Sequence, residues 1–233
     1  LRPNSDHQIK LTGEFFDSDT SIDQLYDKGR LPGLMGLSST NNISRLRDQK
    51  QTRYRLALED DWDVHTPAID NVTWRLSLSP QKRSLFDKRR YDNVRTNTGY
   101  LVNEHRDYTQ NFYQADIQLT SSFDLANTLH KLTYGFQGDQ TDADFYSRRT
   151  TDNLKTGQTN TVYGIGNNFA KSKTIRADLY LQDEIKLFNE RFQLSPGIRR
   201  AHYSLDPSPD KNYTVIAGSE PKKLSKNKWL PQI

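Results

Sequence analysis

Apolar and polar residues alternate strictly along several short segments of the chain. In the clearest of them, residues 175–182, apolar side chains occupy every second position, while Arg176, Asp178 and Gln182 fall on the opposite face. An alternation of period two predicts a β-strand with one apolar and one polar face. The charged residues exclude a strand that is buried on both sides, as in a parallel sheet.

The same alternation recurs along the chain and predicts about eight strands. The other segments are residues 9–16, 53–59, 74–79, 113–119, 132–137 and 192–199, with a short one that starts near Trp229. The connections between these segments alternate in length. Long ones cover residues 18–50, 85–106, 147–172 and 205–226, and short ones cover 63–71, 122–130 and 186–191. Outer-membrane barrels have long extracellular loops and short periplasmic turns, so this order predicts an antiparallel transmembrane β-barrel.

Composition supports a barrel over the other classes of chain. Only 33% of the residues are hydrophobic and the mean hydropathy is -0.91, values that a disordered chain would also show. However, aromatic residues make up 11% of the chain and the net charge is only +4, and disordered chains are poor in aromatics. A barrel has a polar lumen and polar loops, which lower its average hydropathy. No apolar run is long enough for a transmembrane helix.

Charge and cysteine content exclude several functions. The sequence contains no cysteine, so it has no disulfide framework and no thiolate metal site. Lysine and arginine are scattered rather than clustered, which speaks against a nucleic-acid partner. No phosphate-binding glycine loop, nucleophile–base pair or metal-ligand cluster is visible. We therefore expect neither an enzyme nor a resident metal or cofactor.

Two neighbouring segments resemble a known family. Residues 180–185 (YLQDEI) and 192–199 (FQLSPGIR) are similar to the mid-barrel hairpin of TonB-dependent outer-membrane receptors, although Arg200 stands where an aromatic is common in the family. Residues 11–16, 74–81 and 130–139 resemble strands of the haem/haemoglobin receptor branch. The resemblance implies about eight strands of a larger barrel of about 22 strands. Residues 1–233 are then part of one barrel domain, with the plug domain and the closing strands absent.

The resemblance also implies a function in the bacterial outer membrane. It predicts a receptor for TonB-dependent active import of haem, taken up free or from a haem-carrying protein that docks on the extracellular loops. Haem is then the transported ligand. The TonB complex would act through regions outside this chain, and lipid and lipopolysaccharide would surround the barrel. Two alternatives remain: a ferric-siderophore receptor of the same superfamily, or a self-contained small barrel that acts as an adhesin or a pore.

Candidate ligand-binding residues lie in the predicted extracellular loops or near them. Haem iron accepts an axial histidine. His105 lies near the extracellular end of its strand and His202 lies towards that rim, and of the two His105 is the candidate. The family's haem-binding histidines lie in regions that this stretch does not contain, so none is carried over. Exposed loop aromatics often bind partners, and arginine pairs with carboxylates or with lipopolysaccharide phosphates. The remaining candidates are Tyr91, Tyr100, Tyr146, Tyr163 and Arg148. Each has a plainer alternative as a girdle or solvated rim residue.

Overall fold

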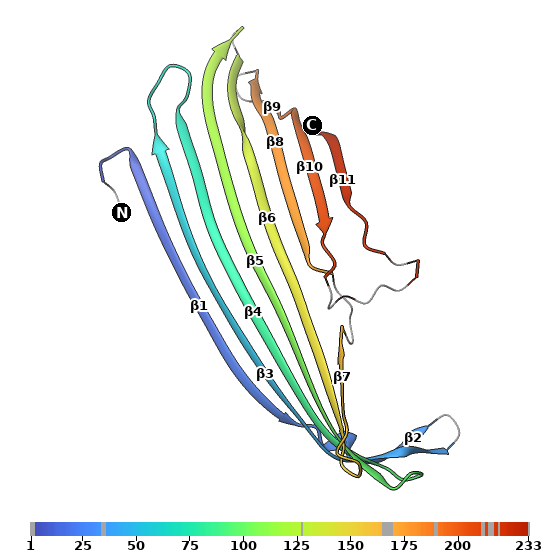
Figure 1. Cartoon of the computed structure of the whole chain (residues 1–233). Coiled ribbons are helices and arrows are strands. Elements are labelled where there is room, and N and C mark those ends of the chain that lie inside the picture. The colour runs from blue at the N-terminus through green and yellow to red at the C-terminus, as the bar shows by residue number, and fades with distance from the viewer. Residues whose placement is uncertain are drawn as a thin grey trace.

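The computed structural model is a single curved antiparallel sheet (Figure 1). It describes residues 3–33, 36–126, 128–164, 170–188, 191–210, 213, 217–218 and 220–232. Within these residues, eleven strands form the sheet, and one turn of 3-10 helix, η1 (Leu25–Asp27), interrupts them. No helix in the described part of the chain is long and apolar enough to cross a membrane.

Eight strands pair side by side in the order of the sequence. They are β1 (His7–Asp23), β3 (Gly36–Asp63), β4 (Asn71–Asn93), β5 (Thr98–Leu125), β6 (Thr128–Asn153), β8 (Ser172–Leu187), β10 (Gly197–Pro207) and β11 (Leu224–Gln232). Three short strands pair beside this path: β2 (Gly29–Gly33) on β3, β7 (Thr159–Tyr163) on β6, and β9 (Phe192–Leu194) on β8. Each of these eight strands is therefore hydrogen-bonded to those of the eight that come directly before and after it in the sequence, as in the wall of an up-and-down barrel.

The structure confirms the predicted antiparallel all-β fold and the place of each predicted strand. Every alternating segment except 192–199 lies within a single strand, and the predicted turn at residues 63–71 corresponds to the connection between Asp63 and Asn71. The segment 192–199 is divided between β9 and β10. The predicted connections 147–172, 186–191 and 205–226 fall partly outside the described residues.

The prediction of long loops was wrong at two places. Residues 18–50 and 85–106 were expected to be solvated loops, but β1 and β3 occupy most of the first range, and only residues 94–97 of the second lie outside β4 and β5. The alternation disappears in these ranges because polar and charged residues occur on both faces of the sheet there, and apolar residues such as Leu46 and Phe86 are isolated. A strand that meets water on both sides needs no apolar face, so its period cannot be read from hydropathy.

The two ends of the sheet differ. In Figure 1 the short turns between β3 and β4 and between β5 and β6 lie at the top, while β2, β7 and the tip of the β4–β5 hairpin lie at the bottom. The central strands are the longest, with 28 residues in both β3 and β5. At about 3.3 Å per residue, each is far longer than the 9–11 residues that a membrane strand needs.

Candidate functional site

An apolar band covers one face of the sheet, near the end with the short turns. Because side chains alternate across a strand, the register places residues of all central strands at the same level on this face. One such level consists of Leu11, Leu58, Leu76, Ala115, Gly138 and Ala177. Two of its three leucines are exposed, Leu11 by 66% and Leu76 by 52%. An exposed apolar patch of this extent requires a partner or a lipid environment. We call this face the outer face.

Aromatic residues border the apolar band on both sides. Trp62 and Trp229 lie towards the short turns, and the paired Phe15 and Tyr54 lie on the far side, with Phe15 exposed by 74%. Tyr54 and Trp62 are separated by eight positions on β3, which is roughly 27 Å along the strand. With a strand tilt of about 40°, this is roughly 21 Å across the membrane. That is close to the apolar band of an outer-membrane barrel, which is about 25 Å tall and flanked by aromatic girdles.

Charged side chains form ion pairs across strands on the opposite face, which we call the inner face. Each pair joins neighbouring strands at one level of the sheet or at adjacent levels. The pairs are Glu59–Arg75 at 3.0 Å, Asp139–Arg176 at 2.9 Å, Asp178–Arg199 at 3.4 Å and Glu14–Arg55 at 3.6 Å. A hollow of about 440 Å³, lined by Arg75, Asp116, Gln118, Tyr180 and Arg199 among others, lies on this face. Such a surface suits a polar lumen.

An arginine–carboxylate network continues the inner face beyond the apolar band. Asp87 accepts hydrogen bonds from Arg45 and Arg47, each with a nitrogen–oxygen distance of 2.9 Å. Burial acts to raise the pKa of Asp87, but these two guanidinium groups outweigh it and hold the pKa below its ordinary value. Asp87 is therefore a carboxylate at neutral pH, and it screens the two arginines from each other.

Glu104 lies directly opposite Asp87 on β5 and pairs with two further arginines. It accepts a hydrogen bond from Arg149 at 2.8 Å and pairs with Arg106. Asp27 contacts Arg45. We call these seven residues the rim network: Asp27, Arg45, Arg47, Asp87, Glu104, Arg106 and Arg149. Four arginines meet three carboxylates in it, so the network carries one net positive charge.

Two of the candidate tyrosines stack beside the rim network. Tyr91 on β4 is the register partner of Tyr100 on β5, and their ring centroids are 5.1 Å apart with an interplanar angle of 19°. The guanidinium carbon of Arg89 lies 4.6 Å from the centroid of the Tyr91 ring, a cation–π contact. The alternation along β4 and β5 places all three side chains on the inner face.

The other candidates form a second cluster, on the outer face. His105 stacks on Phe86 with ring centroids 4.2 Å apart, and it meets Tyr146 edge-on at 5.7 Å. Tyr146 in turn contacts Tyr163 of β7 at 6.5 Å. Arg148 is the register partner of both His105 and Tyr163. The His105 Nε2 atom lies 2.9 Å from a carboxylate oxygen of Asp107. We call Phe86, His105, Tyr146 and Tyr163 the outer aromatic cluster.

Comparison with known proteins decides the family. No curated protein matches the chain significantly. The family model described as the β-barrel of TonB-dependent receptor-like proteins matches residues 2–233. The chain belongs to the TonB-dependent receptor family. Members are outer-membrane receptors and transporters rather than enzymes, which agrees with the apolar band and the polar inner face.

Membership of the TonB-dependent receptor family indicates which end of the sheet lies outside the cell. The short turns lie on the periplasmic side, and the hairpin tips lie outside the cell, as in other outer-membrane barrels. The inner face lines the lumen. The rim network and the Tyr91–Tyr100 stack therefore lie on the lumenal wall at the extracellular side, whereas His105 and its neighbours face away from the lumen.

The structure brings the predicted binding residues together in two groups on opposite faces, not in one site. The tyrosines were expected in loops, but Tyr91, Tyr100, Tyr146 and Tyr163 all belong to strands, and Arg148 and His105 do too. They divide between the two faces because the strands continue beyond the membrane, where neighbouring positions alternate. Within the described residues, no group of three or more histidine, aspartate or glutamate side chains is arranged to hold a metal ion.

The rim network was missed from the sequence. Its carboxylates and arginines come from η1, β3, β4, β5 and β6, and from residues as far apart as Asp27 and Arg149, so no local motif marks it. The one usable signal was the spacing of Arg45 and Arg47, which places two guanidinium groups on the same face of any strand that contains them.

Proposed function

We propose that this TonB-dependent receptor imports haem, captured free or from a haem-carrying protein outside the cell. The observation that carries the proposal is the Tyr91–Tyr100 stack with Arg89 on the lumenal wall. Haem is a planar aromatic ring that bears two carboxylates. Flat tyrosine faces suit the ring, and arginine pairs with carboxylates through paired hydrogen bonds.

The charge at the lumenal rim supports an anionic ligand. The rim network has one net positive charge, and Arg89 adds another beside it. A positive patch at the mouth of a channel raises the local concentration of an anion and its rate of association. The strand segments 11–16, 74–81 and 130–139 that resemble the haem branch provide the second, independent support.

In this mechanism the barrel wall collects and orients the ligand, and the TonB complex supplies the energy for import. The inner-face ion pairs below the rim keep the wall polar along the path of the ligand. His105 has no place in this path, because its ring lies on the outer face. An axial ligand for the haem iron would have to come from elsewhere in the receptor.

A ferric siderophore is the second candidate, because many siderophores are also anionic and would meet the same arginines. Growth of a strain that lacks the receptor distinguishes the two. We expect the deletion strain to fail on haem as its only iron source and to grow on ferric siderophores, with haem growth restored by the full-length gene. Loss of siderophore growth with normal haem growth would overturn the assignment in favour of the alternative.

A further inference from the structure

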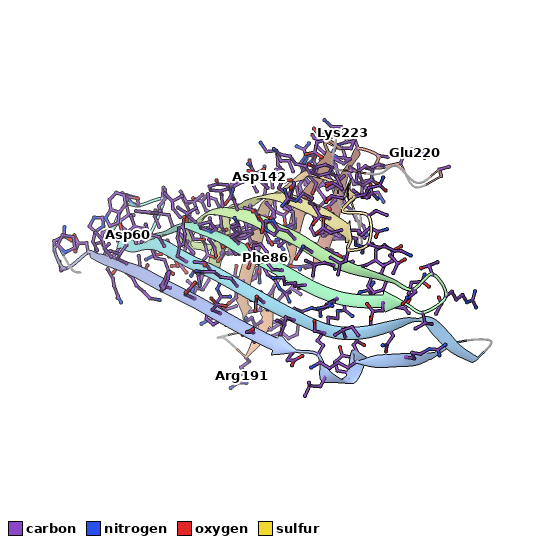
Figure 2. The ribbon with its side chains drawn as sticks, turned by 60° about the horizontal axis from the view of Figure 1, so that its bottom comes forward. Asp60, Phe86, Asp142, Arg191, Glu220 and Lys223 are labelled. Atoms are coloured by element: carbon purple, nitrogen blue, oxygen red, sulfur yellow. The ribbon has the colours of Figure 1, made fainter. Side chains whose placement is uncertain are left out.

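The outer aromatic cluster lies beyond the membrane on the side of the sheet that faces away from the lumen. Phe86 is opposite Asp48 on β3, six positions past the girdle residue Tyr54. Six residues extend roughly 20 Å along a strand. With a strand tilt of about 40°, the cluster lies roughly 15 Å above the apolar band. Figure 2 shows Phe86 on β4 farther along the sheet than Asp60, which lies near the short-turn end.

The cluster presents aromatic surface to its surroundings. Phe86 is exposed by 47% and Tyr163 by 49%. The ring contacts from Phe86 through His105 and Tyr146 to Tyr163 cross four adjacent strands, β4 to β7, and form one continuous surface. A contiguous exposed apolar surface marks an interaction site.

Charged groups surround these rings. Asp107 lies 2.9 Å from His105 Nε2 and 3.5 Å from Lys82 Nζ, so it fixes the histidine and brings an ammonium group beside it. Burial acts to raise the pKa of Asp107, but hydrogen bonds from Ser84 and His105 and the charge of Lys82 lower it below the ordinary value. Arg148, exposed beside His105 and Tyr163, adds a second cation at the edge of the cluster.

We propose that the outer aromatic cluster binds the phosphorylated core sugars of lipopolysaccharide. Aromatic rings pack well against the C–H faces of pyranose rings, and lysine and arginine bind phosphate groups. Lipopolysaccharide forms the outer leaflet around an outer-membrane barrel, and its core sugars and their phosphates lie directly above the acyl chains. The outer surface of the wall, at the height of Phe86 and His105, is where these sugars meet the protein.

The proposal assigns His105, Tyr146, Tyr163 and Arg148 to the membrane surface rather than to the imported ligand. It does not depend on which ligand the receptor imports, because the cluster and the lumenal wall lie on opposite faces of the sheet. A bound core oligosaccharide would contact four strands at once. It would therefore anchor the extracellular part of the wall to the outer leaflet.

Binding to defined glycolipids tests the proposal. The full-length receptor, purified in detergent and freed of lipid, is titrated with lipopolysaccharide that has a phosphorylated core, with the same molecule after removal of the core phosphates, and with lipid A alone. Native mass spectrometry measures the bound fraction. We expect the complete molecule to bind more tightly than either of the others, because only it offers both sugars and core phosphates.

The variant F86A/Y163A removes the two most exposed rings of the cluster. We expect its affinity for complete lipopolysaccharide to fall roughly tenfold, with haem binding unchanged. Y26A is the matched control, because Tyr26 is also an exposed aromatic, by 74%, but lies in η1 away from the cluster. The heat-dependent shift of the folded band on gel electrophoresis verifies that each variant is folded.

Three results would overturn the proposal. One is equal affinity of F86A/Y163A and the wild type for complete lipopolysaccharide. Another is lipid A binding as tightly as the complete molecule, which would place recognition in the acyl region. The third is a receptor dimer that dissociates in F86A/Y163A, which would make a second copy of the receptor the partner of this surface.

Discussion

The hydroxyl group of Tyr180 lies over Gly135 on the neighbouring strand, where there is no room for a side chain at position 135. A Cβ atom added to Gly135 would be 2.8 Å from the Tyr180 hydroxyl oxygen and 2.1 Å from the carbonyl oxygen of Ile117. Both residues face the lumen, and the Tyr180 hydroxyl is 3.3 Å from Gln118 Oε1. The glycine thus lets strands β5, β6 and β8 pack closely at the level of the membrane.

Substitution of Gly135 should weaken the barrel wall. We expect G135A to lower the free energy of unfolding by about 1–3 kcal/mol, because the new methyl group must displace a backbone carbonyl as well as the Tyr180 ring. The urea midpoint of the folded band on unheated gels measures the effect. G13A is the control, since nothing lies within 4 Å of a Cβ at Gly13. An equal midpoint for the two variants would contradict the close packing.

The rim network should contribute to stability through Asp87. D87N keeps the shape of the side chain but leaves Arg45 and Arg47 without a shared counter-charge, so we expect a loss of about 2 kcal/mol. D48N, on the outer face of the same pair of strands, removes an exposed carboxylate and should change stability by less than about 0.5 kcal/mol. The comparison uses the same urea midpoint. A larger loss for D48N than for D87N would refute the role of the network.

The lowered pKa of Asp87 predicts a pH dependence with a definite sign. A carboxyl whose pKa is lower in the folded state stabilises the fold fully above its unfolded pKa of about 3.9, and this contribution is lost as the pH falls towards the folded value. Stability of the wild type should therefore fall more steeply than that of D87N below about pH 4. Parallel stability curves for the two proteins across this range would show that Asp87 is not ion-paired.

Haem binding should depend on the lumenal face and not on the outer one. We expect Y91A to weaken haem binding by the full-length receptor about tenfold, because it removes both the ring stack and the cation–π contact with Arg89. H105A should bind haem as the wild type does. Titration of the purified receptor, followed by the absorbance of haem, measures both. A loss confined to H105A would reverse the assignment of the two faces.

Adjacent residues on β1 test the membrane face directly. Leu11 lies in the apolar band, and Thr12 points to the lumen. L11K should destabilise the inserted barrel by about 2–4 kcal/mol, since it places a charge among lipid chains, whereas T12K should be tolerated. Unfolding from lipid vesicles separates the two variants. If T12K were the more harmful change, the inner and outer faces would be exchanged.

The parts of the fold that lie in lipid could be predicted from the sequence, and the parts outside could not. Tyr54 and Leu56 alternate with Arg53 and Arg55 because one side of β3 meets lipid and the other meets the lumen. Ten residues earlier, the stretch around Arg45 and Arg47 belongs to the same strand, but on its outer face Leu46 stands alone between Ser44 and Asp48, so the period is hidden. The hydropathy pattern shows whether each face of a strand meets lipid or water, and it does not show whether the segment is a strand.

The candidate site was only partly predictable for the same reason. Tyr91 and Tyr100 were found because they are aromatic, but their shared face follows only if β4 and β5 continue without a break from the membrane. Once that continuity is known, counting every second residue from the lipid-facing Leu78 reaches Arg90 and Asp92. Tyr91, between them, therefore falls on the lumenal face. The pairing of Asp87 with Arg45 joins residues of two strands, and only the register of β3 against β4 brings them into contact.

The length of the central strands has a consequence for how the receptor meets its ligand. Hydrogen bonds between β3, β4, β5 and β6 continue without a long interruption from the periplasmic turns to the hairpin tips. The extracellular part of this wall is therefore a stiff extension of the barrel rather than a set of separate flaps. Its groups are held in position before a ligand arrives, so little conformational entropy is lost when it binds. The ligand then binds in a vestibule whose shape is already formed before binding.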